Sequence, residues 1–293
     1  MDQSLEKPRV VSLGAPRRFR ISRRVRLLLR NPTAMVGAVI LAFWIIMAAI
    51  GPLVAPYGIN EITAGAVWKP PTADHIMGTD QLGRDIFSRV IVGARQMVVL
   101  PTLAVGLAIL LGASIGLLSG YLGGWVDEIV MRVMDGIMAF PVLMLYLMII
   151  VAIGASAVNV VLALGIGAAP AVSRLVRGLV LDLRNREFIA AAKMRGESTA
   201  YILFQEIRPN AIGPVLVDGL VRIGYACFSM GALGFLGLGV PPPAPDWGQM
   251  VSQARNALLI TPTAPLFPAL SIASLVVSLN LVADGLTEAG KAE

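Results

Sequence analysis

The chain alternates between long apolar stretches and shorter polar stretches, and this alternation sets its expected architecture. Six apolar stretches are long enough to be membrane spans, because about 20 apolar residues cross a bilayer as a helix. They cover residues 34–55, 97–118, 133–153, 157–172, 211–238 and 266–286. The fourth is the shortest and follows the third after only three residues, so a single re-entrant hairpin is an alternative there. The pattern predicts an all-α, polytopic membrane protein with six transmembrane helices.

Composition agrees with a membrane protein, and the residues show no motif for enzymatic chemistry. Hydrophobic residues make up 56% of the chain and charged residues 14%, whereas soluble domains have about a quarter charged residues. The single Cys227 and the single His75 exclude a disulfide framework and any metal site that needs several such ligands. We expect His75 to be an exposed loop residue. The only Gly-Lys pair, at Gly290, is followed by Ala292, so no phosphate-binding P-loop is present. We therefore expect no catalytic, cofactor-binding or metal-ligating residue.

The 24 Lys and Arg residues are unevenly distributed along the chain. Nine of them precede residue 31 and seven lie between residues 173 and 210. Such clusters form neither a groove nor a stripe, so we expect no nucleic-acid partner. Basic segments of membrane proteins stay in the cytoplasm, which predicts a basic cytoplasmic tail at residues 1–33 before a transmembrane domain at residues 34–293.

The same rule orients the loops. Six crossings from a cytoplasmic N-terminus return the C-terminus to the cytoplasm. The loops expected in the cytoplasm are 119–132 and 173–210, and those expected outside are 56–96, 154–156 and 239–265.

The polar insert at residues 183–210 predicts two short helices joined by a tight turn. Asn185 can cap the first helix, and Gly196 can end it in a left-handed conformation. Ser198 can cap the second helix, which we expect to end at Pro209, since proline has no amide proton to donate. Two capped helices around a glycine form a rigid protrusion that suits contact with a soluble partner.

Two groups of residues within the spans stand out. Gly112, Gly116 and Gly120 place small residues on one helical face, which favours close packing against another helix. Asp218 and Arg222 lie one turn apart in the fifth span and can form an ion pair. The pair is either a gate or pathway contact, or a self-satisfied pair at a helix interface.

The predicted outer loop at residues 239–265 is rich in proline and should be stiff. Asp246 and Trp247 within it either meet a substrate-delivery protein or belong to a scaffold that seals the outer end of the bundle.

Four separated blocks resemble the permease subunits of ATP-binding-cassette (ABC) importers of the dipeptide, oligopeptide and nickel family. They occur in the family's order and cover almost the whole chain. The blocks are GTDQLGRDIFSRVIVGAR at 78–95, GYLGGWVDEIVMRVMDGIMAFP at 120–141, GFLGLGVPPPAPDWGQM at 234–250 and LNLVADGL at 279–286. Shared placements of Gly, Pro, Trp and Asp make this more specific than matching hydrophobicity.

The polar insert resembles the signature by which these importers contact their ATPase subunits. The matching positions are Ala191, Ala192, Gly196, Ile207 and Pro209. Two positions depart from the signature. Ala190 stands where the family has glutamate, with Glu187 one turn earlier as a partial substitute, and Arg208 stands where it has leucine.

The resemblance implies a type I ABC importer permease fold in the bacterial cytoplasmic membrane, embedded in lipid. It implies three kinds of partner: a second, homologous permease subunit, two cytoplasmic subunits that bind ATP and Mg, and an extracytoplasmic substrate-binding protein. The chain would form half of a path for di- and oligopeptides, coupled to ATP hydrolysis through residues 187–209. Nickel or another small solute is the alternative cargo. An ion-gradient-driven secondary transporter and a membrane scaffold are the alternatives from other classes.

Overall fold

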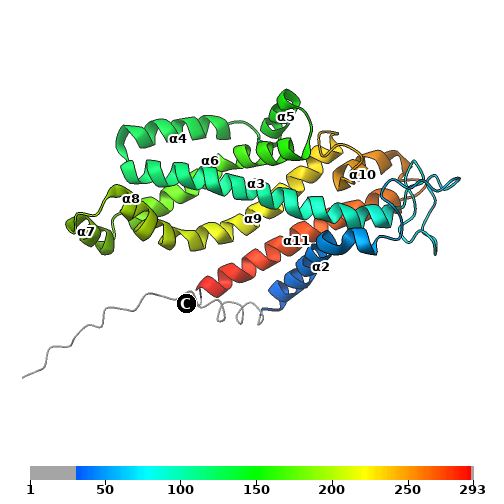
Figure 1. Cartoon of the computed structure of the whole chain (residues 1–293), viewed down its shortest axis with the longest axis horizontal. Coiled ribbons are helices and arrows are strands. Elements are labelled where there is room, and N and C mark those ends of the chain that lie inside the picture. Colours follow the sequence, from blue (N-terminus) through cyan, green and yellow to red (C-terminus); the bar gives the residue numbers. More distant parts are fainter. Residues whose placement is uncertain (1–30, 292–293) are drawn as a thin grey trace, which may run out of the picture.

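The computed structural model describes residues 31–291, with side chains to residue 288, as a bundle of helices (Figure 1). Five helices are long and apolar enough to cross a membrane, and a bent pair is a sixth candidate. The five are α2 (Pro32–Val54), α3 (Ile86–Leu122), α6 (Ala157–Leu183), α9 (Arg208–Phe235) and α11 (Thr263–Lys291). Within the described residues, the β-structure is one isolated bridge between Thr79 and Asp85. The predicted all-α, polytopic fold is confirmed.

The third predicted span, residues 133–153, is not a continuous helix. The structure divides it between α4 (Gly124–Met138) and α5 (Val142–Ile153), whose axes meet at 87°. Pro141 precedes α5 and explains the break, because a proline ring disfavours a helical conformation in the preceding residue. The predicted inner loop at 119–132 is likewise mostly helical, with only a turn at Gly123, whose φ is positive, between α3 and α4.

The fourth span is longer than predicted. α6 continues past residue 172 to Leu183 and is by itself long enough to cross a membrane, whereas the bent pair of α4 and α5 before it is either a broken span or a re-entrant loop. Arg174 and Arg177 do not end this helix, because acidic residues of α4 form ion pairs with them. Arg177 Nε and Nη2 each donate to the Asp127 carboxylate at 2.6 Å, and Arg174 pairs with Asp135.

Close approach of α3 and α6 forms the centre of the bundle. A Cβ atom at Gly112 would lie 2.5 Å from the carbonyl oxygen of Ala169, and one at Gly116 would lie 2.4 Å from that of Ser173. Real Cβ atoms do not come this close to backbone oxygen. The predicted packing role of the glycine series is therefore confirmed.

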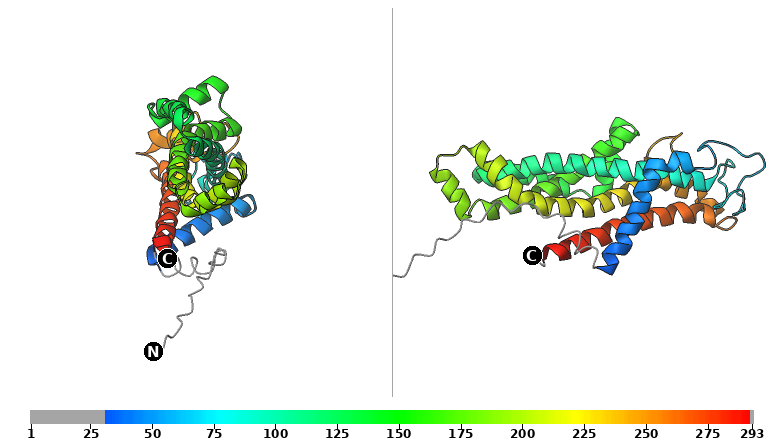
Figure 2. Two further views of the ribbon diagram at one scale, coloured as in Figure 1. Left: turned by 90° about the vertical axis from the view of Figure 1, so that its left-hand side faces the viewer. Right: turned by 60° about the horizontal axis from the view of Figure 1, so that its bottom comes forward.

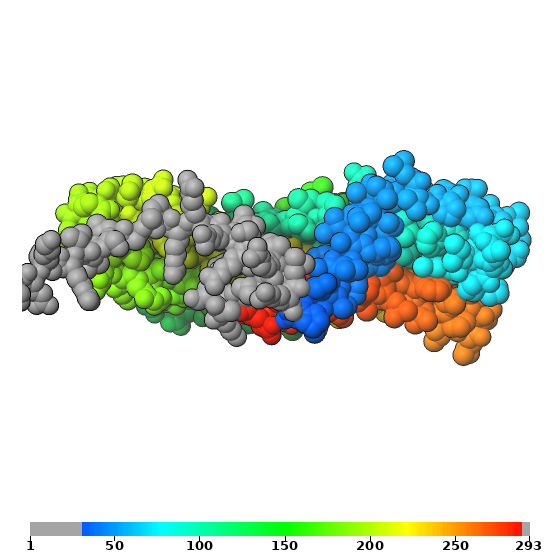
Figure 3. Space-filling view, turned by 90° about the horizontal axis from the view of Figure 1, so that it is seen from below, coloured from blue at the N-terminus to red at the C-terminus, as the bar shows by residue number. Residues whose placement is uncertain are grey.

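The molecule is elongated, with different structures at its two ends (Figure 1). The segment between α6 and α9 forms one end, and the loop at residues 55–85 forms the other. α2 packs obliquely against α3 and α11 (Figure 2). The view from below shows that loop beside the segment around α10 (Trp247–Ala254), where Thr261 Oγ1 donates to the carbonyl of Trp68 (Figure 3).

Two buried apolar clusters correspond to these ends. One contains Trp44, Met97 and Trp247 and fills the wider part of the bundle near the 55–85 loop. The other joins α3, α6 and α9 to the segment between α6 and α9. The basic residues before Asn31, on which the predicted orientation partly rests, lie outside the described residues.

Candidate functional site

The segment between α6 and α9 is a compact unit of three short helices. It comprises α7 (Glu187–Met194), α8 (Thr199–Tyr201) and a π-helical turn, η1 (Ile202–Ile207). We call residues 184–207 the coupling protrusion. Figure 1 shows it at the tip of the bundle, beyond the ends of α3 and α6.

Backbone hydrogen bonds fix the turn after α7. The amide of Glu197 donates to the carbonyl of Ala192 at 3.2 Å, and that of Gly196 donates to Lys193 at 3.0 Å. These two backbone hydrogen bonds form a Schellman motif, which needs a residue in the left-handed conformation directly after the helix. Gly196 has a φ of +77° and supplies it. Ser198 Oγ then accepts from the amide of Tyr201 at 3.2 Å. The predicted glycine stop and serine cap are both confirmed.

Two predicted helix ends are wrong. Asn185 does not cap α7, because its side chain donates to the carbonyl of Leu181 in the preceding helix, and Arg186 occupies the cap position. Pro209 does not end the second helix. The amide of Arg208 donates five residues back, to the carbonyl of Leu203. This wider, π-helical turn lies directly before Pro209, which has no amide proton for the helical hydrogen bonds. The chain therefore continues through Pro209 into α9 as one helix from Thr199 to Phe235.

The structure divides the signature residues into an inner and an outer group. Ala192 and Ile207 are fully buried and pack with Ile189 and Ile202 against α6. They position the coupling protrusion on the bundle. The outer group is open to contact from outside the chain: Glu187, Ala190, Gly196 and Pro209 are exposed, and Ala191 is half-buried.

Polar contacts add to this attachment. Arg195 lies 3.5 Å from Glu197 and 3.4 Å from Glu206, which connects the end of α7 to η1. Lys193 Nζ lies 5.7 Å from the centre of the Tyr121 ring at the end of α3. Since exposed ion pairs contribute little, the apolar cluster is the main attachment, and the coupling protrusion is fixed to α3, α6 and α9 together.

The predicted ion pair in α9 is confirmed. Arg222 Nε contacts the carboxylate of Asp218, and both side chains are partly exposed. Arg222 also lines a cavity beside Tyr146 of α5 and Tyr225 of α9. This cavity could not be predicted from the sequence, because the elbow between α4 and α5 forms one of its walls.

Asp246 and Trp247 do not lie on an outer contact surface, and their predicted role in meeting a delivery protein is wrong. Both are buried. Asp246 accepts backbone hydrogen bonds from Val240 at 3.1 Å and Gln249 at 2.9 Å, and the Trp247 indole donates to the carbonyl of Val90 at 3.0 Å. They belong to the alternative, a scaffold at this end of the bundle.

The glycines of the same block make room for Asp246. A Cβ atom at Gly234 would lie 2.1 Å from Asp246 Oδ1, and one at Gly239 would lie 2.4 Å from Oδ2. Close packing at this end of the bundle therefore accounts for the positions of the Gly, Asp and Trp residues in the 234–250 block.

Burial gives Asp246 a pH-dependent effect on stability. Desolvation raises the pKa of its carboxyl above the ordinary value of 3.8, although hydrogen bonds from backbone amides oppose the rise. The unfolded chain then loses this proton at lower pH than the folded chain, so stability falls as pH rises from 3.8 through the folded-state pKa. We expect Asp246→Asn to remove this slope. Thermal unfolding of the detergent-solubilised protein between about pH 4 and 7 checks it, and equal slopes in both proteins would contradict it.

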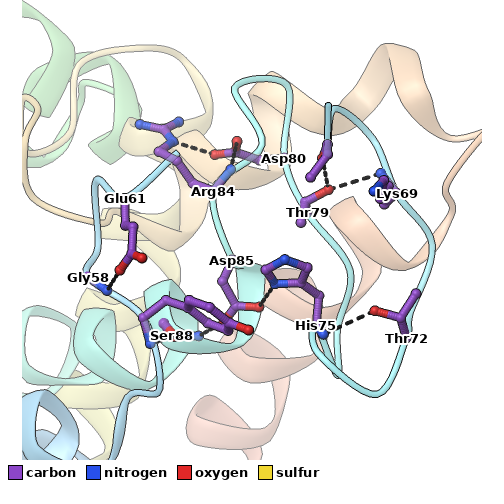
Figure 4. Close-up of polar contacts among 12 residues, drawn as sticks. Gly58, Glu61, Lys69, Thr72, His75, Thr79, Asp80, Arg84, Asp85 and Ser88 are labelled. Carbon is purple, nitrogen blue, oxygen red and sulfur yellow. Dashed lines mark hydrogen bonds and ion pairs between the residues drawn. The ribbon is translucent and has the colours of Figure 1, made fainter. Parts of the chain in front are cut away.

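The predicted exposure of His75 is also wrong. His75 is 5% exposed, and its Nδ1 lies 3.0 Å from Asp85 Oδ1 (Figure 4). The ring of Tyr57 packs against the His75 ring. Asp85 also accepts from the amide of Ser88 and so caps α3. His75 thus holds the 55–85 loop against the start of α3.

Comparison with known proteins decides the family. The model of the family described as "Binding-protein-dependent transport system inner membrane component" matches residues 108–289, which is more than half of the chain. This chain belongs to that family. A model of the N-terminal transmembrane domain of oligopeptide transport permease C matches residues 21–71 of this permease.

Curated relatives of this permease match it over most of its length. The dipeptide transport system permease protein of Alkalihalophilus pseudofirmus is 38% identical over 89% of this chain and 86% of its own. The oligopeptide transport system permease protein of Bacillus subtilis is 38% identical over 88% and 85%. The glutathione transport system permease protein of Pectobacterium atrosepticum is 36% identical over 90% and 88%.

A solved structure supports the fold of the permease. A chain of the MetNI methionine ABC transporter, in an inward-facing conformation, matches with a TM-score of 0.57. The match covers 70% of this permease and 96% of that chain at 15% identity, so it bears on fold alone. The resemblance to ABC importer permeases and the fold expected from it are confirmed. The chain is a multi-pass membrane permease subunit.

Sequence reasoning missed one feature of this permease's coupling protrusion. Several large apolar side chains are exposed there, and Met194 is the most open at 84%. The others are Phe188, Tyr201 and Phe204. Exposed apolar side chains of this size are candidates for contact with another protein chain or with lipid. Their presence within an otherwise polar insert was the available signal.

Proposed function

We propose that this chain forms half of the translocation path of an ATP-driven importer of di- and oligopeptides. The observation that carries the proposal is the continuity of the coupling protrusion with the bundle. The buried Ala192 and Ile207 fix it to α6, and its second helix runs without interruption into α9. A displacement at the tip therefore moves two candidate membrane spans.

The mechanism follows from this rigid connection. Two cytoplasmic partner subunits bind ATP and Mg, and they close on each other when ATP binds. The outer residues of the coupling protrusion, which include Glu187, Ala190, Ala191 and Met194, sit against one of them. When the ATPase subunits close, they displace the coupling protrusion together with α6 and α9. Closure and reopening thus expose the path alternately to the two sides of the membrane. This chain supplies no hydrolytic residue and binds no cofactor.

The remaining partners follow from the two faces of the bundle. The polar residues Asp218 and Arg222 are too costly to expose to lipid. A second, homologous permease subunit covers them, and the path runs between the two subunits. The 55–85 loop and the exposed prolines Pro241, Pro242 and Pro243 face outward and receive an extracytoplasmic substrate-binding protein. This arrangement places the chain in a bacterial cytoplasmic membrane with both termini inside.

Peptide cargo is supported by the relatives, since dipeptide, oligopeptide and glutathione permeases share 36–38% identity with this chain over most of its length. The apolar cavity beside Arg222 suits such a cargo, because peptides combine apolar side chains with charged termini.

Reconstitution of the complete transporter in proteoliposomes tests the proposal. We expect peptide uptake to require ATP and the binding protein, and to persist when ionophores collapse every ion gradient. Peptide-loaded binding protein should also stimulate ATP hydrolysis. Uptake driven by an ion gradient without ATP, or an unchanged rate of ATP hydrolysis, would contradict the proposal.

A further inference from the structure

The cavity beside Arg222 has the size and lining of a small-molecule site. It has a volume of about 450 Å³ and lies between α3, the elbow of α4 and α5, α6 and α9. Ligand sites are mostly apolar, with a few polar groups that orient the ligand. Phe140, Leu143 and Leu164 supply apolar walls here. Arg222 is the one charged side chain among the described residues that line it.

A second cavity provides a contrast. It has a volume of about 420 Å³ and lies between α9, α10 and α11, where glycine, alanine and larger apolar residues line it. It offers no group that would hold a charged ligand. Of these two cavities, the one beside Arg222 is therefore the one equipped for a charged molecule.

Arg222 retains free hydrogen-bonding capacity. A guanidinium carries five N–H donors, and the contact with Asp218 uses Nε alone. Among the described residues, the two Nη groups have no hydrogen-bond partner. Arg177 differs, because its Nε and Nη2 bind both oxygens of Asp127, which is the geometry of a completed structural pair. The Asp218 pair leaves one edge of Arg222 available.

Arg222 belongs to a polar row on one face of α9. Asp218, Arg222, Tyr225 and Ser229 follow at intervals of four, three and four residues. Tyr225 is 68% exposed, and it lines the cavity together with Ser229. Polar rows within membrane spans face water or protein rather than lipid. The row therefore borders the translocation path, if the proposed function is correct.

We propose that Arg222 binds the C-terminal carboxylate of a peptide as it passes through this cavity. Guanidinium pairs with carboxylate through two parallel hydrogen bonds, which is the geometry that two free Nη groups permit. The apolar walls accept the peptide's side chains. Asp218 neutralises part of the charge and keeps the affinity low enough for release. This inference rests on the proposed peptide transport.

The test measures access to the cavity in the complete transporter in nanodiscs. Tyr225→Cys, in a Cys227→Ala background, provides a thiol whose rate of modification reports occupancy. The probes are trialanine and trialanine amide, which differ in the C-terminal carboxylate. We expect trialanine to protect the thiol at a concentration about tenfold lower than the amide, because a charge-assisted hydrogen bond is lost with the amide. Equal protection by the two peptides, or none by either, would overturn the proposal.

Matched variants separate binding from a structural ion pair. Arg222→Gln should make the two peptides equivalent, and Arg222→Lys should keep part of the difference. The double variant Asp218→Arg with Arg222→Asp preserves an ion pair but moves the positive charge by one helical turn. We expect it to lose protection by trialanine. Protection equal to wild type in the double variant would show that the pair is only structural.

Failure of the proposed function would look different. In that case the wild-type transporter imports no trialanine in proteoliposomes with ATP and binding protein, whatever the labelling shows. Normal import combined with identical behaviour of the two probes would reject the carboxylate site alone.

Discussion

Gly196→Ile is expected to reduce peptide uptake about tenfold while ATP hydrolysis continues. Gly196 has a φ of +77° and completes the turn after α7. A left-handed conformation costs an ordinary residue about 1–2 kcal/mol, and a β-branched residue is especially unfavourable there. Since 1.4 kcal/mol is about a tenfold change in a population ratio, the native shape of the coupling protrusion would become about tenfold less populated relative to its alternatives. Uptake and ATP hydrolysis in proteoliposomes measure the effect.

Gly196→Asn is the matched control. Asparagine adopts the left-handed conformation more readily, and a Cβ atom at this position would have no neighbour within 4 Å. Uptake should remain close to wild type. Normal uptake by Gly196→Ile at wild-type membrane levels would contradict the coupling role, and equal loss in both variants would show that the conformation of the turn is not the cause.

Gly116→Val is expected to lower thermal stability and the amount of folded protein in the membrane. A Cβ atom there would lie 2.4 Å from the carbonyl oxygen of Ser173 and 3.0 Å from the amide nitrogen of Arg177. Both are backbone atoms of α6, so α3 and α6 must move apart. Overpacking of this kind costs roughly 1–3 kcal/mol. Size-exclusion chromatography after heating the detergent-solubilised protein measures the loss.

Gly106→Val is the control for helix propensity and added bulk. It lies in α3 as well, but a Cβ atom there would have no neighbour within 4 Å. Valine also forms helix somewhat better than glycine, so we expect no loss of stability. Similar losses in the Gly116 and Gly106 variants would contradict the account of close packing between α3 and α6.

Features that depend on neighbours in sequence could be predicted. The apolar stretches predicted the long helices. Gly196 and Ser198 predicted the turn of the coupling protrusion, because a helix cap or a left-handed stop acts within one helical turn. The Asp218 and Arg222 pair is equally local. The glycine series in α3 predicted a close contact without naming its partner.

Features that depend on distant partners could not be predicted. Arg177 looked like a loop residue because Asp127, which neutralises it, lies 50 positions earlier. Asp246 looked exposed because its burial depends on groups that approach it only in the folded chain. These are the amide of Val240, which donates to its carboxylate, and Gly234, which leaves space for it. Pro141 was a local signal for the elbow between α4 and α5, but the apolar residues around it favoured one continuous span.

The most direct measurement of the central claim is photocrosslinking from the tip of the coupling protrusion. Met194, which is 84% exposed, is replaced by cysteine in a Cys227→Ala background and carries a benzophenone label in the complete transporter. Leu82→Cys, in the 55–85 loop at the opposite end, carries the same label as a control. We predict that the Met194→Cys variant crosslinks to an ATP-hydrolysing subunit, with a yield that changes when ATP is added, and that the control does not. Crosslinks from position 194 that never reach such a subunit would contradict the account.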